Sequence, residues 1–346
     1  MRSSAPAATR QIRPVAAALF MLASVACFAM NSILVRYVSA DMHPFEIAFF
    51  RNFFAAAIIV PIALWHDGIG ILRARRIDLL TGRGVVNAAS MIAWFYAVPL
   101  IPLADLTALG FTAPLWATIL AALLLGETVR RRRWTATIVG FAGALVIIRP
   151  GFVDVSLGVW LVLFSSAMWA ATTIFVRVLT GHERPGTILV YQTLMLTAIS
   201  LVPALFVWEW PRIEVFGWLI VLGLLTAIAH FCHVRAYTLQ EVAALQPIDF
   251  GRLPIVALAA WLVFGEIADV WVWVGAVIVF LAGAYISHRE AQVKREAARA
   301  AEATRLTEAA AAARRAAEAA ARAAALSPAA ATPISRTEKP QPDRAE

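Results

Sequence analysis

The chain is 346 residues long, 61% of its residues are hydrophobic and only 15% are charged, and its mean hydropathy is +0.75. These proportions exclude an ordinary water-soluble domain, which needs a more polar surface. The formal net charge is +8, but the arginines stand beside apolar segments, which favours a membrane protein and argues against nucleic acid as a partner.

The first apolar stretch follows a basic N-terminal segment, residues 1–14. It covers residues 15–37, which is too long for the core of a signal peptide, and it ends without a clean small-residue cleavage site. A transmembrane helix needs about 20 apolar residues, so we interpret this stretch as a retained first span. Apolar runs predict ten spans in all, at 15–37, 45–65, 84–101, 103–125, 134–149, 157–179, 186–208, 215–238, 243–264 and 270–287.

Arginine marks alternate connections between these spans. It occurs before the first span, in the second connection at residues 73–83, which includes Arg83, and in the fourth at residues 130–133. The third connection has neither lysine nor arginine. Cytoplasmic loops carry such an excess of positive charge, so we expect a cytoplasmic N-terminus and, with ten spans, a cytoplasmic C-terminus.

The chain contains two related halves. Gly-Glu-Thr at residues 126–128 and Gly-Glu-Ile at residues 265–267 each close an apolar stretch, and the offset between them also relates Phe111 to Phe250. Further upstream a slightly larger offset relates Ser24 to Ser165. Duplicated membrane units are typical of transporters, whose solute sites lie between the halves. The two Gly-Glu pairs are expected to cap helices or to form gate contacts.

The duplication predicts a first five-helix repeat at residues 15–149 and a second at residues 150–287. Because each repeat has an odd number of spans, the second must enter the membrane from the opposite side. The predicted fold is therefore an all-α integral membrane protein of ten transmembrane helices, arranged as two inverted five-helix repeats.

The composition changes in the tail, residues 288–346. Residues 288–325 are rich in alanine, arginine and glutamate, with opposite charges at helical spacing, and predict a cytoplasmic helix. This helix is either solvated along its length or binds a partner or anionic headgroups. From residue 327 on, alanine, proline and charge predict disorder.

Several short runs resemble one transporter family. Residues 43–51, His-Pro-Phe-Glu-Ile-Ala-Phe-Phe-Arg, resemble the start of the second helix in the EamA branch of the drug/metabolite transporter superfamily. Residues 95–100, followed by an alanine at 104, resemble its third-to-fourth helix turn. Residues 113–127, followed by Trp134 and Gly140, are similar to its fourth and fifth helices. The resemblance covers residues 15–287 and omits the tail.

The resemblance implies ten helices, a multi-pass protein of the bacterial inner membrane, and transport of a small organic solute without a nucleotide-hydrolysing domain. Within the branch, the run at residues 43–51 is closest to S-adenosylmethionine carriers and riboflavin carriers. Export of amino acids or other metabolites is the alternative within the same family.

Arg51 is the first candidate for solute binding. It lies about seven residues, or about 10 Å at helical rise, into the second span. A central arginine costs about 2.5–3.5 kcal/mol to insert, so we expect a wet cavity or a partner there. Arg51 either binds a solute carboxylate or forms a structural pair with Glu46. Its counterpart in the second repeat is Gln192, so the charge is not duplicated.

Asp249 and Arg252 stand three residues apart in the ninth span. On one helix face they can form a structural ion pair. Alternatively, Asp249 carries a coupling proton or attracts a cationic solute, and the positive charge of Arg252 adjusts the behaviour of Asp249. The segment 246–252 also contains a proline and a glycine, so a bent helix there would free backbone carbonyls for a ligand.

His230 and His233 lie in the eighth span. No cysteine or acidic cluster accompanies them, so we expect no metal site. His230 is a candidate, with Asp249, for proton coupling, because histidine titrates near neutral pH. Packing against neighbouring helices is the alternative for both histidines.

Uncharged polar and aromatic residues complete the candidate site: Asn31, Asn87, Trp94, Tyr191 and Gln192. An aromatic heterocycle such as adenine or flavin would stack on Trp94 or Tyr191. The alternative for tryptophan is a lipid-facing or interfacial position, and for Asn31 it is an interhelical hydrogen bond.

The leading functional hypothesis is a secondary transporter that works by alternating access on a small-molecule substrate within the lipid bilayer. A channel or a lipid-processing membrane enzyme is the alternative from another class. The sequence has no Walker-type or His-Glu-x-x-His motif and no paired acidic cluster, so we expect no catalytic residues and no cofactor. A homodimer is compatible with the sequence.

Overall fold

The computed structural model describes residues 14–124, 126, 131–151, 154–179, 181–240 and 242–326. The regular structure of these residues is helical throughout, which confirms the all-α prediction. The chain divides into two compact units, the first ending at Glu290 and the second beginning at Ala291. The predicted disorder after residue 327 falls outside the described residues.

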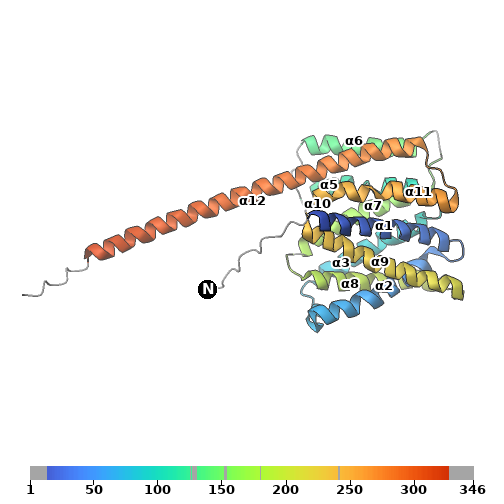
Figure 1. The fold of residues 1–346 in the computed structure, drawn as a ribbon, viewed down its shortest axis with the longest axis horizontal. Helices are drawn as coiled ribbons and strands as arrows, with labels where there is room; N and C mark the ends of the chain where they lie inside the picture. The colour runs from blue at the N-terminus through green and yellow to red at the C-terminus, as the bar shows by residue number, and fades with distance from the viewer. Residues whose placement is uncertain are drawn as a thin grey trace, which may run out of the picture. The chain divides into compact units, whose positions relative to one another are not determined.

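The helices are labelled in Figure 1. Their bounds are α1 Pro14–Val38, α2 Pro44–Asp67, a 3-10 helix η1 Ile69–Leu72, α3 Ile77–Ala97, α4 Leu103–Gly110, α5 Ala113–Leu124, α6 Arg131–Ile148, α7 Leu157–Leu179, α8 Pro185–Leu205, α9 Ile213–Leu239, α10 Val242–Phe250, α11 Arg252–Phe264 and α12 Val270–Leu326.

Eight helical segments among the described residues are long and apolar enough to cross a membrane. They are Pro14–Val38, Pro44–Asp67, Leu103–Leu124, Leu157–Val176, Gly186–Leu205, Ile213–Leu239, Pro247–Phe264 and Val270–Val293. The predicted spans 84–101 and 134–149 correspond to α3 and α6, which carry polar or arginine residues and do not meet that threshold. The chain is therefore an all-α, multi-pass membrane protein.

Two predicted spans are each interrupted near the middle. α4 and α5 are separated at Phe111, and α10 and α11 are separated at Gly251. Pro114 and Pro254 follow these breaks and have no backbone N–H to continue the helical bonding to the residue four positions earlier. The sequence therefore contains the cause of both interruptions. The bend predicted for residues 246–252 is present as the break at Gly251, whereas the break at Phe111 was not predicted.

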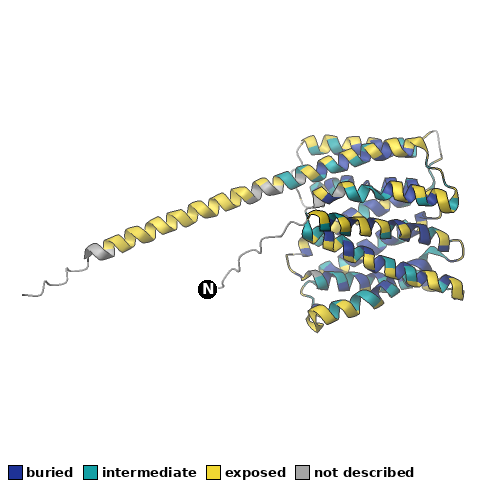
Figure 2. Cartoon of the chain, viewed as in Figure 1, coloured by how far each residue is buried: buried dark blue, intermediate teal, exposed yellow. Residues whose placement is uncertain are grey.

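Helix pairing in the first unit joins segments that are far apart in the sequence. α1 packs along α9 and α2 packs along α8 (Figure 1), and α3 packs along α7. Buried positions lie on the faces where these helices meet, whereas large apolar side chains such as Leu123 and Leu262 are exposed (Figure 2). An apolar exterior is the arrangement expected for a surface in contact with lipid.

The second unit consists, in its described part, of the end of α12. Residues 299–322 are exposed at every position (Figure 2). Its composition, rich in alanine with glutamate and arginine, explains a stable helix without a packed face, because alanine has the highest helix propensity and opposite charges stand at helical spacing.

Candidate functional site

Arg51 lies half-buried on α2 and faces α3. Its guanidinium carbon is 4.7 Å from the centre of the Phe95 ring, and its Nη2 donates to Asn52 Oδ1 at 3.1 Å. Its Nε is buried and has no hydrogen-bond partner among the described residues. Arg51 and Glu46 form no ion pair among the described residues, and the Glu46 carboxylate accepts the backbone N–H of Glu209 at 2.6 Å.

Arg83 is a candidate that sequence reasoning missed. It lies on α3 with only 6% of its surface exposed, and its Nη2 donates to Gln192 Oε1 of α8 at 2.6 Å. Its Nε is also buried without a partner in the described part of the chain. Arg83 was grouped with the arginines of a cytoplasmic loop because the predicted span began at residue 84. The signal that could have found it is the spacing to Asn87, one helical turn further along α3.

Asn87 is more deeply buried than either arginine, with 2% of its surface exposed. Its amide nitrogen has no hydrogen-bond partner among the described residues. Buried polar atoms almost always have partners, so each such atom in a native structure needs an explanation. Among the described residues, donors of Arg51, Arg83 and Asn87 are thus buried without acceptors.

His230 on α9 belongs to the same region. Its ring meets that of Phe28 edge-on at 5.4 Å, and its Nδ1 lies 2.8 Å from the backbone oxygen of Thr226. Because a carbonyl oxygen only accepts, Nδ1 is the donor in that bond. The imidazole lies within electrostatic range of the guanidinium groups of Arg51 and Arg83.

Asp249 and Arg252 do not form an ion pair, which was one of the two alternatives for these residues. Asp249 is on α10 and Arg252 begins α11, so the break at Gly251 separates them. In the described part of the chain, Arg252 instead lies over the Phe111 ring, with 5.3 Å between the guanidinium carbon and the ring centre, and its Nε has no partner. The charge of Asp249 acts on His233 of α9.

Three of the uncharged candidates have structural contacts. Asn31 donates to Leu222 O at 3.2 Å and to Thr226 Oγ1 at 2.8 Å, which is the interhelical alternative. Trp94 packs edge-on against Phe95, with 5.6 Å between the ring centres. The Tyr191 hydroxyl donates to Leu72 O at 2.9 Å, at the end of η1. The structure brings Arg51, Asn87, Gln192 and His230 to one region with Arg83, and it holds Tyr191 at the edge of that region.

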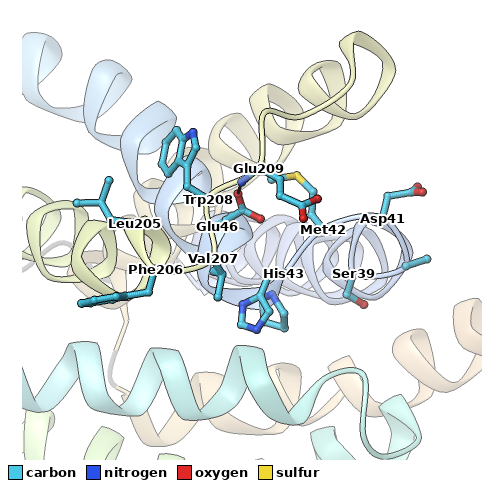
Figure 3. A pocket seen from close by; sticks show the side chains of 12 residues that line it. Ser39, Asp41, Met42, His43, Glu46, Leu205, Phe206, Val207, Trp208 and Glu209 are labelled. Atoms are coloured by element: carbon cyan, nitrogen blue, oxygen red, sulfur yellow. Dashed lines mark hydrogen bonds between the residues drawn. The ribbon is translucent and has the colours of Figure 1, made fainter.

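Two pockets lie at opposite ends of α2 and α8. The first has a volume of about 780 Å³ and is lined by residues 39–44 and 46 with 205–209. Figure 3 shows the side chains of Glu46 and Glu209 close together in this pocket, with the His43 ring pointing away from them. The second has a volume of about 540 Å³ and is lined by residues 70, 73–75, 182–184 and 187. Neither of these pockets is lined by Arg51 or Arg83.

An ion pair closes the bundle at the end of α1. Arg36 Nη2 is 2.5 Å from Glu266 Oε1, and Glu266 Oε2 accepts the backbone N–H of Leu103 at 2.9 Å. Arg36 also donates to the backbone oxygens of Val98 and Ile101. The second Gly-Glu pair therefore caps α4, whereas the glutamate of the first pair, Glu127, lies outside the described residues.

A family profile and two curated relatives all indicate that this chain is similar to transporters. The profile of the EamA-like transporter family matches residues 15–149 and again residues 156–287. A riboflavin transporter of Vibrio cholerae is 32% identical over 297 residues, which cover 83% of this chain and 98% of that protein. An S-adenosylmethionine uptake transporter of Rickettsia prowazekii is 28% identical over 271 residues, which cover 78% of this chain and 92% of that protein.

A solved structure described as the crystal structure of a protein has a TM-score of 0.57 at 16% identity, and the match covers 81% of this chain and 99% of that one. At this identity the likeness concerns the fold alone. The family matches and the curated relatives confirm the predicted class, which is transport and not catalysis. The chain belongs to the EamA-like transporter family.

Proposed function

We propose that this protein is a secondary carrier that moves riboflavin, or a flavin of similar shape, across the bacterial inner membrane by alternating access. Its ten spans form two inverted repeats, residues 15–149 and 150–287. Residues 1–14 and the tail, residues 288–346, lie in the cytoplasm. The free donors of Arg51 and Arg83 are the observation that carries the proposal.

Helix packing supports the inverted repeat. The sequence offset that relates Ser24 to Ser165 makes α7 the counterpart of α1 in the second repeat. The offset that relates Phe111 to Phe250 makes most of α9 the counterpart of α3. The packing of α1 on α9 and that of α7 on α3 are therefore equivalent contacts. The number of membrane spans is ten when α3 and α6 are added to the eight strongly apolar segments of the described residues.

The two interrupted helices support a solute site at the centre. Phe111 and Phe250 occupy equivalent positions in the two repeats, and their ring centres are 4.2 Å apart. The interruptions of α4–α5 and α10–α11 therefore meet each other. Discontinuous helices at the interface of inverted repeats are a recurring way to build a solute site inside a membrane.

The charges of this region favour riboflavin over S-adenosylmethionine. In the described part of the chain, Arg51 and Arg83 donate to amide oxygens and neither contacts a carboxylate. S-adenosylmethionine has one carboxylate that an arginine could bind, but its sulfonium and ammonium groups give it a net positive charge, which two cationic groups without anionic partners would repel. The flavin ring system is uncharged at neutral pH and offers several acceptors along one edge, so it satisfies arginine donors without adding positive charge.

The two pockets support alternating access. They lie at the two ends of α2 and α8. Arg51 lies on α2 between these ends, and Arg83 of α3 donates to Gln192 of α8. Under the expected orientation, the first pocket faces outward and the second faces the cytoplasm. Each is then the vestibule that leads to the central site in one of the two states, and only one path is open at a time.

The experiment is uptake of labelled riboflavin into proteoliposomes that contain the purified full-length protein, with labelled S-adenosylmethionine as the comparator. We expect saturable uptake of riboflavin that an excess of unlabelled riboflavin inhibits, and little uptake of S-adenosylmethionine. Preloading the vesicles with unlabelled riboflavin should accelerate uptake, because a carrier exchanges solute across the membrane. A linear, non-saturating flux would indicate a channel.

A further inference from the structure

Arg83 and Asn87 lie one turn apart on α3, and three contacts hold that helix in place. Ser90 and Ser165 of α7 exchange hydrogen bonds, in which each hydroxyl donates to the other residue's backbone oxygen at 2.8 Å. Gly84 faces Met195 of α8 so closely that an added Cβ would lie 2.6 Å from the sulfur. The positions of the Arg83 and Asn87 backbones are therefore fixed by packing against both neighbouring helices.

Arg83 is oriented by Gln192, which accepts from its Nη2 at 2.6 Å. That bond leaves the Nε of Arg83 and the amide nitrogen of Asn87 buried without acceptors among the described residues. Removing polar groups from water without partners is unfavourable, and packing alone does not require an asparagine at a position that is 2% exposed. The pair therefore has the character of a recognition site that is fixed before its ligand arrives.

We infer that Arg83 and Asn87 form the subsite that recognises the imide edge of a flavin ring, which is the carbonyl–NH–carbonyl side of its pyrimidine ring. This inference rests on the proposed function. The Asn87 amide has both donors and an acceptor, so it complements one carbonyl together with the imide N–H. Arg83 donates to a neighbouring acceptor of the same ring, and Gln192 keeps its guanidinium in that orientation.

The donor pattern distinguishes this edge from other planar groups. A carboxylate has acceptors only and would leave the acceptor of Asn87 unused. The edge of adenine pairs with an asparagine amide, but it has no carbonyl for Arg83. An imide edge uses both donor groups and the acceptor, so the Arg83–Asn87 subsite determines specificity for the flavin head and not for its ribityl chain.

The test uses riboflavin and 3-methylriboflavin as competitors of labelled riboflavin in proteoliposomes. Methylation at N3 removes the imide N–H and blocks that edge, while the rest of the molecule is unchanged. We expect the wild-type protein to prefer riboflavin by at least about tenfold, which corresponds to about 1.4 kcal/mol. In the Asn87→Leu variant, the affinity for riboflavin should fall, and riboflavin and 3-methylriboflavin should compete about equally well.

The matched control is Thr81→Ala, which changes an exposed residue of the same helix whose hydroxyl donates to Ile77 O at 2.8 Å. It should keep both the affinity and the preference of the wild type. Thermal unfolding of the purified Asn87→Leu variant gives a second readout. Its melting temperature should equal or exceed that of the wild type, because a buried donor without a partner is replaced by an apolar group of similar size.

The outcomes separate the two proposals. If the wild type takes up riboflavin and Asn87→Leu keeps the full preference over 3-methylriboflavin, the subsite is wrong and the carrier function stands. If Asn87→Leu melts at a markedly lower temperature and keeps the preference, Asn87 is structural. If the folded wild-type protein does not transport riboflavin, the proposed function and the subsite are both wrong.

Discussion

Arg36 and Glu266 form an ion pair with 2.5 Å between Nη2 and Oε1, and it joins the end of α1 to the segment after α11. Glu266 also caps α4 through the backbone N–H of Leu103. Three parts of the bundle are thus tied at one point. Opening this end of the bundle requires these bonds to break, so the tie belongs to the closed state of one face.

We predict that locking this contact stops transport. Arg36→Cys and Glu266→Cys together, in a background in which Cys27 and Cys232 are alanine, should react with a bifunctional methanethiosulfonate reagent that spans the former side chains, and this cross-link should abolish riboflavin uptake. Reduction should restore uptake, because the cross-link prevents opening without changing the solute site. The two single-cysteine variants serve as controls. Unchanged uptake by protein that mass spectrometry shows to be cross-linked would contradict the assignment.

Arg51→Gln should reduce uptake at low solute concentration by about tenfold to a hundredfold, because hydrogen bonds to charged groups contribute roughly 1.5–3 kcal/mol. Membrane insertion and the elution profile in detergent should be unchanged. Arg235→Gln is the control, because Arg235 is an exposed arginine on α9. Equal uptake by Arg51→Gln and the wild type would remove Arg51 from the site.

Acid should weaken a second ion pair, between Arg149 and Asp269, which lies outside the membrane-spanning segments. Asp269 accepts the backbone N–H of Trp271 and pairs with Arg149 at 2.5 Å, and these contacts lower the pKa of its carboxyl below the usual value. Because the pKa of Asp269 is lower in the folded than in the unfolded protein, the ionised carboxylate stabilises the fold at any pH above the unfolded-state pKa. This stabilisation is lost as the pH falls through the folded-state pKa.

The thermal stability of the wild type should therefore decrease as the pH falls below about 4, the usual pKa of an aspartate. Asp269→Asn should show a smaller decrease over the same range. The difference should be small, because exposed ion pairs contribute little. Melting curves between neutral pH and this acid range measure it, and identical pH profiles for the two proteins would show that Asp269 does not contribute.

Removal of residues 291–346 should leave uptake unchanged. The family match ends at residue 287, and the described part of the second unit is an exposed helix without a packed face. Initial rates per reconstituted protein, measured for the full-length and the truncated chain, test this. A lower rate at equal incorporation would assign the tail a role in transport.

The class of fold followed from the sequence because the membrane imposes long apolar helices, and the run at residues 43–51 indicated the family. The bend expected at residues 246–252 corresponds to the break at Gly251. The interruption at Phe111 was not predicted, because hydropathy reports only whether a segment is apolar. Pro114, three residues after Phe111, is the residue that could have indicated this break, because a proline removes a helical hydrogen bond.

The site was predictable only in part. Arg51 was found because a charge inside an apolar span is rare. Arg83 was missed because it stands at the border of its span, where an arginine normally belongs to a loop. Asp249 and Arg252 were expected on one helix face, and the break at Gly251 places them on different helices. Which donors remain without partners depends on tertiary packing, which helical spacing does not encode.

The most direct test of the central claim is equilibrium binding of riboflavin to the purified protein, followed by quenching of flavin fluorescence. The wild type should bind saturably, Arg51→Gln and Arg83→Gln should each bind at least about tenfold more weakly, and excess S-adenosylmethionine should not displace the flavin. Displacement by S-adenosylmethionine, or equal binding by the wild type and both variants, would contradict a flavin site built on these buried arginines.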